Sequence, residues 1–310
     1  MKLLAGNSNK PLAQAISRHL NIPLIDVEYK PFPDLEIFLE IQENVRGSDV
    51  FVIQSTSTPV NDSLMELLLT IDALKRGSAN SITAVIPYYG YARQDRKTAP
   101  RTPISAKLVA DLIQTAGVSR VLSFEFHSAP IQGFFDVPVD NLFASPLFAS
   151  DIQSRYDLSN TVIVSPDVGG LSRARAIAKR LSLDVAVIDK RRTGVGQVDV
   201  MNVIGHIQGK DCILVDDIMD SGGTLIKAAQ ALKTQGAQSI SAYCVHGVLS
   251  GDALKRLDES LIQDMCFTDS IHLKDQVLDH PRVRQLTVAP LIGVAIQRIS
   301  RNESVSSLFT

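Results

Sequence analysis

Three carboxylates stand beside a turn of small residues in the stretch "ILVDDIMDSGGTL", residues 213–225. Asp216 and Asp217 end an apolar run, and Asp220 comes three positions later. The turn that follows opens a helical pattern and consists of Ser221, Gly222, Gly223 and Thr224. Backbone N–H groups of such a turn point outward at the positive end of the helix, where anions bind. The glycines permit close approach and the hydroxyl groups add donors, so the turn is suited to a phosphate monoester.

The carboxylates need a different partner, because they would repel the phosphate. They can accept hydrogen bonds from sugar hydroxyls and can attract Mg²⁺ through water. A phosphate beside vicinal hydroxyls describes a ribose 5-phosphate, which is the ligand that the stretch predicts. No lysine follows the glycines, so the stretch is not a P-loop. A capped helix beside a solvated acidic loop is the alternative interpretation.

Short β-rich runs alternate with helical patterns along the chain, and these elements must position the acidic stretch. The runs are continuous and apolar, which is typical of parallel strands covered by helices on both faces, so an α/β fold is predicted. Ligands bind beyond the carboxyl ends of such strands, where "ILVDD" brings its acids. Predicted strands include residues 2–6, 49–55, 81–90, 119–126, 161–167, 184–189, 212–217 and 239–245, and predicted helices include 61–77, 103–117, 171–182 and 224–236.

An internal repeat indicates that the domain is duplicated. "ALKRGSANSITA" at 73–84 aligns without gaps to "ALKTQGAQSISA" at 231–242, and a strand, a loop and a helix precede both. A chance match of two short helix-turn-strand segments is the alternative. The first copy has "QSTSTPVNDS" where the second has "DDIMDSGG", so the acidic pair occurs in the second copy alone. We place the two domains at 1–145 and 146–310.

Composition excludes several classes of function. The 310 residues carry a formal net charge of −2, so no bulk attraction to nucleic acid or to an anionic membrane is implied. No apolar stretch approaches the roughly 20 residues that span a bilayer, and "MKLLAGNSNK" has no apolar region long enough for a signal peptide. Three cysteines stand far apart in apolar runs and are interpreted as reduced core residues: Cys212, Cys244 and Cys266. We expect a cytoplasmic protein.

The acidic stretch resembles the phosphoribosyl pyrophosphate loop shared by type I phosphoribosyltransferases and ribose-phosphate diphosphokinases. Other segments favour the ribose-phosphate diphosphokinases. The chain is similar to that family at residues 85–97, 133–142, 164–181, 188–192, 246–251 and 303–309. The resemblance implies transfer of the β,γ-diphosphoryl group of ATP to O1 of ribose 5-phosphate, giving phosphoribosyl pyrophosphate and AMP for nucleotide biosynthesis. It also implies Mg²⁺.

The resemblance implies a fold of two tandem phosphoribosyltransferase-type domains, each a mostly parallel sheet flanked by helices. The first domain would carry the ATP-contacting loops and the oligomer contacts, and the second the ribose 5-phosphate loop. We expect the last helix to pack on the first domain. A phosphoribosyltransferase that consumes the product is a further alternative, but the tandem domains, "ARQD" and "KRR" argue against it.

Family positions assign roles to several cations and to two metal-linked residues. The catalytic lysine and arginine correspond to Lys190 and Arg192, in "DKRR" just past a predicted strand, although without this context the run would be a solvated basic loop. Cations there suit diphosphoryl transfer, which needs charge stabilisation on phosphate oxygens. In "ARQD", the resemblance implies that Arg93 and Gln94 contact ATP. It also implies that His127 and Asp167 are metal-linked. Mg²⁺ prefers oxygen ligands, so the histidine rests on the resemblance, and a structural histidine is its alternative.

"FPDLE" at residues 32–36 corresponds to a family loop that reaches into the ATP site of a neighbouring subunit. Phe32 would stack on the base, and Asp34 and Glu36 would bind its edge. The resemblance therefore implies a homo-oligomer, at least a dimer and by default the family hexamer. Pro33 and Leu35 replace the usual Ser and Gly, which stiffens this loop.

Three further differences from the family pattern suggest an alternative function. Glu125 stands where the family usually has Asp, "TGVGQ" at 193–197 replaces a "PRPN"-like stretch, and no basic residue lies between Lys97 and Arg101. These differences are compatible with altered activity, nucleotide preference or regulation by phosphate and ADP, and equally with neutral drift. The altered 193–197 loop motivates the alternative hypothesis of a non-catalytic regulatory subunit with the same fold.

Overall fold

The computed structural model describes residues 1–191 and 200–308, and it divides the chain into two compact units. The first consists of Met1–Phe143, Ser270–His272 and Thr287–Thr310, and the second of Ala144–Asp269 and Leu273–Leu286. Each unit contains a mostly parallel sheet flanked by helices, which confirms the predicted α/β class. Across the described part of the chain, no helix combines the length and apolar character that a membrane crossing requires.

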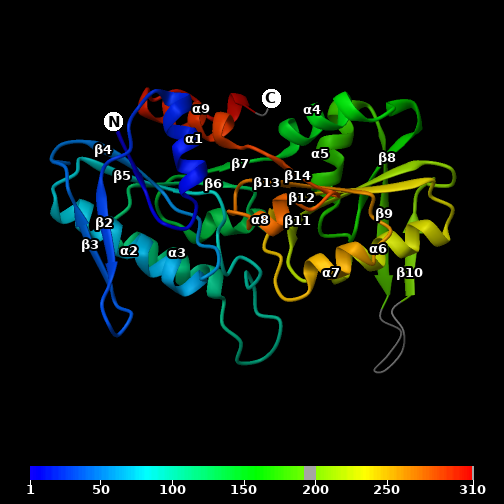
Figure 1. Cartoon of the computed structure of the whole chain (residues 1–310), viewed down its shortest axis with the longest axis horizontal. Helices are drawn as coiled ribbons and strands as arrows, with labels where there is room; N and C mark the ends of the chain where they lie inside the picture. The colour runs from blue at the N-terminus through cyan, green and yellow to red at the C-terminus, as the bar shows by residue number, and fades with distance from the viewer. Residues whose placement is uncertain (192–199, 309–310) are drawn as a thin grey trace. The chain divides into compact units, whose positions relative to one another are not determined.

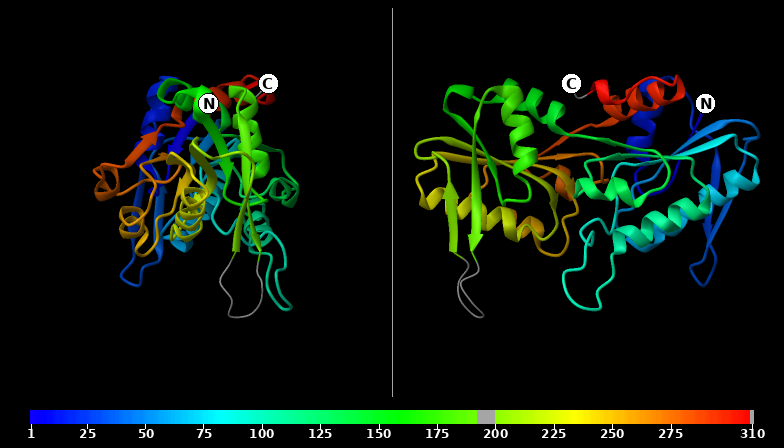
Figure 2. Two further views of the ribbon diagram at one scale, coloured as in Figure 1. Left: turned by 90° about the vertical axis from the view of Figure 1, so that its right-hand side faces the viewer. Right: turned by 180° about the vertical axis from the view of Figure 1, so that it is seen from behind.

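The first unit has a five-stranded parallel sheet with the order β1-β4-β5-β6-β7. Its strands are β1 (Lys2–Ala5), β4 (Asp49–Ile53), β5 (Ser81–Ile86), β6 (Arg120–Phe124) and β7 (Val139–Leu142). One face is covered by α2 (Val60–Arg76) and α3 (Ser105–Ala116), and the other by α1 (Lys10–Leu20) and α9 (Ala289–Ser300) (Figure 1). The antiparallel hairpin of β2 (Val27–Pro31) and β3 (Ile37–Ile41) extends away from this sheet (Figure 2).

The second unit has a seven-stranded sheet with the order β10-β9-β8-β11-β12-β13-β14, in which β10 alone is antiparallel to its neighbour. Its strands are β8 (Thr161–Ser165), β9 (Asp184–Arg191), β10 (Val200–Ile204), β11 (Asp211–Met219), β12 (Ser239–Gly247), β13 (Asp264–Thr268) and β14 (Val283–Leu286). The helices α4 (Ser145–Arg155) and α5 (Leu171–Leu181) cover one face; on the other lie α6 (Gly223–Thr234), α7 (Ala253–Asp258) and α8 (Asp275–Leu278) (Figure 1).

The strand register supports the duplication. Asp49 of β4 pairs with Ser81 of β5, and Asp211 of β11 pairs with Ser239 of β12. In each pair the serine Oγ donates to the aspartate Oδ1 at 2.5 Å. Both repeat segments run from the end of a helix into the next strand. The same side-chain contact at the same register therefore recurs in both units.

Each sheet packs its core on alternating apolar residues of its strands. In the second unit the core between the sheet and α6 includes Leu214, Ile240 and Leu232, all at most 2% exposed. Cys212, Cys244 and Cys266 are buried free thiols, as the sequence predicts. These packed strands form the rigid base from which the acidic stretch projects.

Candidate active site

The acids of the motif lie within β11, which is longer than the apolar run indicates. Pairing with β8 ends at Leu214, whereas β11 continues beside β12 as far as Met219. Asp216 and Asp217 therefore occupy the part of β11 that runs past β8. This is the carboxyl end of the parallel strands, where open α/β sheets bind ligands.

Arg173, the third residue of α5, lies against both acids. Its Nη1 is 3.7 Å from Asp216 Oδ1, and its Nη2 is 3.5 Å from Asp217 Oδ2. The side chains of Arg173, Asp216 and Asp217 are 12%, 15% and 7% exposed. The backbone N–H of Asp217 also donates to Asp216 Oδ1 at 2.9 Å. A largely buried cation is thus placed across a largely buried acid pair.

Burial and the neighbouring carboxylate perturb the pKa of Asp216. Burial raises the pKa of Asp216 well above its usual range, and the neighbouring Asp217 carboxylate raises it further, whereas Arg173 lowers it. Burial, followed by the same two acids, also raises the pKa of the Cys244 thiol on β12. A strongly perturbed carboxylate such as Asp216 is typical of functional sites, where burial and like charges are arranged to shift pKa values.

The turn after β11 has the geometry of an anion cradle. Gly222 precedes α6 with a φ of +78°, in the left-handed region that glycine adopts readily. Gly222 has no side-chain oxygen to cap α6, so the first N–H groups of the helix, from Gly223 and Thr224, are suited to an anion. Ser250 Oγ donates to Asp220 Oδ1, and Arg256 Nη1 donates to the Ser221 carbonyl at 3.2 Å. The outer side of the turn is thereby braced.

The loop after β8 also closes on itself. Asp167 Oδ1 accepts a hydrogen bond from the Gly170 N–H at 2.8 Å, and Ser165 Oγ donates to the Asp167 carbonyl at 2.7 Å. Asp167 is exposed in the second unit, and His127 is exposed after β6 in the first. Within residues 1–191 and 200–308, no three His, Cys, Asp or Glu side chains form a metal-binding cluster. The assignment of His127 and Asp167 to a metal stays a prediction.

The catalytic pair falls at the limit of the described residues. β9 extends to Arg191, so the backbone of Lys190 lies in the strand, opposite Met201 of β10, and not just past it as the sequence predicts. The longer strand is explained by pairing with β10, which the apolar pattern does not reveal. Arg192 and the 193–197 loop lie outside the described residues.

The adenine-loop candidate is a tight turn between β2 and β3. The Phe32 N–H donates to the Glu36 carbonyl at 2.7 Å, and the Glu36 N–H donates to Asp34 Oδ1 at 3.2 Å. Leu35, where the family usually has Gly, has a φ of +73° and is 81% exposed. The turn therefore keeps the left-handed conformation that glycine favours. The Phe32 ring packs edge-on against Phe38 and remains 48% exposed.

The "ARQD" segment leads from β5 toward α3. Gln94 accepts hydrogen bonds from Ser105 Oγ at its side chain and from the Ala106 N–H at its carbonyl. Arg93 is exposed beside it. Glu125, where the family usually has Asp, is buried with a φ of +49°, and its N–H donates to the Leu142 carbonyl at 2.7 Å. Short Asp or Asn is more common in this conformation than Glu.

Sequence reasoning missed three residues that contact the acidic stretch: Arg173, Ser250 and Arg256. Arg173 was within reach of prediction, since it occupies the first turn of a helix that follows the strand beside β11. The contacts of Ser250 and Arg256 join segments 30 and 35 positions apart, and no periodic pattern indicates them.

Comparisons with known proteins agree with this arrangement. Residues 1–117 match the family model for the N-terminal domain of ribose phosphate pyrophosphokinase, and residues 190–310 match the model for the phosphoribosyl synthetase-associated domain. The chain is 61% identical to a ribose-phosphate pyrophosphokinase of Granulibacter bethesdensis, with 100% of both chains covered. It is 58% identical to the Mesorhizobium japonicum protein of the same name, again over 100% of both.

A solved structure extends the similarity to the fold. The crystal structure of phosphoribosylpyrophosphate synthetase from Mycobacterium smegmatis superposes with a TM-score of 0.92 at 40% identity, covering 97% of this chain and 99% of that one. Full-length similarity at this level, together with the two domain matches, shows that the chain belongs to the ribose-phosphate pyrophosphokinase family.

Proposed function

We propose that the chain transfers the diphosphoryl group of ATP to O1 of ribose 5-phosphate, giving phosphoribosyl pyrophosphate and AMP for nucleotide biosynthesis. The observation that carries this proposal is the anion cradle at Gly222, which follows the largely buried acids Asp216 and Asp217 at the end of β11. A sugar phosphate offers a dianion to the cradle and hydroxyl donors to the acids. The names and full-length identity of the relatives support the same reaction.

The acceptor is held at both ends. The turn of Ser221, Gly222, Gly223 and Thr224, adjacent to Asp220, takes the 5-phosphate, and Asp216 with Asp217 accept hydrogen bonds from the ribose hydroxyls. O1 attacks the β-phosphorus of ATP, the bond from that phosphorus to the oxygen retained by AMP breaks, and the O1 proton leaves to solvent. Lys190 and Arg192 stabilise negative charge on the transferring group, which is the main demand of such a reaction.

Mg²⁺ is the metal that we propose. The carboxylates of Asp167, Asp216 and Asp217 are hard oxygen donors, and Mg²⁺ usually binds through one or two carboxylates together with water and substrate phosphates. When bound, Mg²⁺ would neutralise charge on the ATP phosphates. His127 of the first unit is proposed as metal-linked on the family resemblance.

The donor and the assembly are also proposed. Arg93 and Gln94 contact ATP within the same chain, and Phe32, Asp34 and Glu36 contact ATP bound to a neighbouring subunit. The exposed Phe32 ring and the projecting hairpin suit that role. The proposed active form is therefore a homo-oligomer, by default a hexamer. The proposed compartment is the cytoplasm.

The test is an assay of the purified chain with Mg²⁺, ATP and ribose 5-phosphate. We expect AMP and phosphoribosyl pyrophosphate in equal amounts, no AMP without ribose 5-phosphate, and loss of turnover on metal chelation. Lys190→Ala should lower kcat by several orders of magnitude, whereas the exposed Lys179→Ala on α5 should not. AMP release that ignores ribose 5-phosphate would contradict the proposal. An inert protein that binds an active relative would identify a regulatory subunit.

A further inference from the structure

Arg173 has no role in the assigned chemistry, yet it lies against both acids that are proposed to hold the sugar. We propose that Arg173 is a positioning residue: it holds the Asp216 and Asp217 carboxylates together at the ribose position and so sets the KM for ribose 5-phosphate. This inference rests on the proposed function, since it takes ribose 5-phosphate as the acceptor.

The geometry of the guanidinium fits this role. Its two terminal nitrogens divide between the two acids, Nη1 at 3.7 Å from Asp216 and Nη2 at 3.5 Å from Asp217. A planar fork can address two carboxylates at once, which a lysine ammonium cannot. Both distances exceed the usual range of about 2.7–3.2 Å for N–H···O hydrogen bonds. In these two contacts Arg173 therefore contributes mainly charge and orientation.

The arginine is delivered from a rigid element. Its own N–H donates to the Gly170 carbonyl at 3.0 Å in the first turn of α5. The next residue, Ala174, is fully buried, and Ile177 one turn later is also fully buried. The loop before α5 is closed by the hydrogen bond from the Gly170 N–H to Asp167. Arg173 is therefore fixed by the packing of α5.

The first unit offers an internal comparison. The register that aligns Asp49 with Asp211 places Gln54 and Ser55 where the second unit has Asp216 and Asp217. The third residue of α1 is Leu12, which is 1% exposed in the core, where the third residue of α5 is Arg173. The copy without the acids thus also lacks the arginine, as expected if the three residues form one functional unit.

Charge explains why the acids need this partner. Two adjacent carboxylates repel each other when buried, and the dianionic phosphate that binds at the following turn adds to the repulsion. Without Arg173 the two carboxylates would turn apart, and their oxygens would no longer be held together at the ribose hydroxyls. The binding of ribose 5-phosphate would therefore weaken, and the binding of ATP would not.

The experiment compares Arg173→Met with the wild type and with Arg175→Met, a control on the exposed face of the same helix. We expect Arg173→Met to raise the KM for ribose 5-phosphate about tenfold or more, a typical cost of losing a residue that orients a ligating group. The KM for ATP should change less than about twofold. Arg173→Lys should recover part of the loss, because it restores charge without the fork. Arg175→Met should match the wild type.

Direct binding separates this inference from the proposed reaction. Calorimetric titration of wild type and variant with ribose 5-phosphate reports the acceptor site even if no turnover occurs. An inert wild type that binds ribose 5-phosphate, while Arg173→Met binds it weakly, would reject the reaction and keep the positioning role. An unchanged KM and Kd for ribose 5-phosphate, or equal losses for both substrates, would overturn the inference. If Arg173→Met does not fold, Arg173→Gln carries the same measurements.

Discussion

The edge after β4 in the first unit is closed by its own side chains, whereas the corresponding edge of β11 in the second unit presents acids. Gln54 stands in register with Asp216. Its Nε2 donates to Glu66 Oε1 at 3.0 Å and to the Ser63 carbonyl at 3.1 Å. Its Oε1 accepts from Ser8 Oγ at 2.7 Å. The amide therefore uses its hydrogen bonds within the unit.

The loop after β1 completes this closure. Glu66 accepts from the Asn7 backbone N–H at 2.6 Å and from Asn7 Nδ2 at 2.7 Å. A Cβ added at Gly6 would overlap the Gln54 side chain. Ser55, in register with Asp217, donates its Oγ to the Ser270 carbonyl at 2.6 Å. The positions that carry acids in one copy are thus used for internal structure in the other.

The difference teaches how the same strand-loop-helix element serves two purposes. A buried cluster whose polar atoms pair with each other is stable, but it offers little to a ligand. In the acid pair of β11, burial and the neighbouring Asp217 carboxylate raise the pKa of Asp216, so holding these acids at the edge carries an electrostatic cost. We infer that the second unit gives up stability at this edge for binding and that the first does not.

The largest expected effect is the loss of acceptor binding when the acids of β11 are neutralised. Asp216→Asn combined with Asp217→Asn removes charge-assisted hydrogen bonds of about 1.5–3 kcal/mol each. We therefore expect kcat/KM for ribose 5-phosphate to fall by about 10²- to 10⁴-fold, with ATP binding retained. Steady-state kinetics and calorimetry measure both. The wild type should bind one ribose 5-phosphate per chain. Binding of a second equivalent would contradict the conclusion that only the second unit binds the acceptor.

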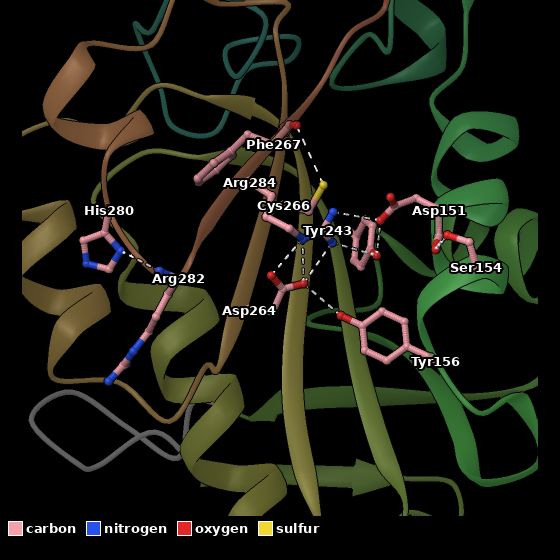
Figure 3. Close-up of polar contacts among 10 residues, drawn as sticks. All are labelled: Asp151, Ser154, Tyr156, Tyr243, Asp264, Cys266, Phe267, His280, Arg282 and Arg284. Carbon is pink, nitrogen blue, oxygen red and sulfur yellow. Dashed lines mark hydrogen bonds and ion pairs between the residues drawn. The ribbon is translucent and has the colours of Figure 1, made fainter.

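The second unit also contains a closed polar network, which sharpens the contrast within one sheet (Figure 3). Arg284 of β14 donates from Nε to Asp264 Oδ1 at 2.9 Å and contacts Asp151 of α4 at 3.0 Å. Its Nη2 donates to the hydroxyl of the buried Tyr243 at 3.0 Å. Removing the arginine would leave two acids without this cation. Arg284→Met should therefore lower the free energy of unfolding by about 3 kcal/mol at pH 7.

The effect of Arg284 should depend on pH. Burial acts to raise the pKa of Asp264, but the hydrogen bonds and charge of Arg284 outweigh it and lower that pKa. The stabilisation is present above the unfolded pKa of about 3.9 and is lost as pH falls through the lower folded value. Urea unfolding of wild type and Arg284→Met at several pH values measures this loss: the difference between their unfolding free energies should shrink as the pH falls. The KM for ribose 5-phosphate should not change, and a rise would link this network to the site.

A smaller effect is expected at the closed edge of the first unit. Glu66→Gln replaces an acceptor oxygen with an amide group that faces the donors of Asn7 and Gln54. Leaving such a buried group unsatisfied costs about 1–3 kcal/mol, so the urea midpoint should fall. Kinetic constants for ribose 5-phosphate should match the wild type. If the KM rises instead, the first unit is not the inert copy that its contacts indicate.

The sequence predicts the sheets better than it predicts the contacts around the acids. Strand and helix patterns are local, so the runs around β4 and β11 and the repeat are visible without a structure. The extension of β9 to Arg191 depends on pairing with β10, and the role of Gln54 depends on Glu66 and Asn7 from other elements. Such contacts are set by tertiary packing, which a single sequence does not display.

The smallest effect concerns two glycines that both have a positive φ but have different surroundings. Gly222 at the cradle has a φ of +78°, and Gly47 in the first unit has a φ of +68° with no atom near an added Cβ. An alanine in the left-handed region costs about 1–2 kcal/mol, so both substitutions should destabilise the protein to a similar extent. At Gly222 the added Cβ would also come within 2.9 Å of Met219 Cε, whose flexible end can move.

Ligand binding should therefore separate the two variants when stability does not. Gly222→Ala displaces the N–H groups at the start of α6, and we expect a rise in the KM for ribose 5-phosphate of about three- to tenfold, equivalent to about 0.7–1.4 kcal/mol. Gly47→Ala should leave that KM unchanged. Parallel melting curves and steady-state kinetics provide the measurement. Equal KM values with equal destabilisation would mean that the left-handed turn before α6 serves only the fold, and the phosphate would then have to bind through side chains.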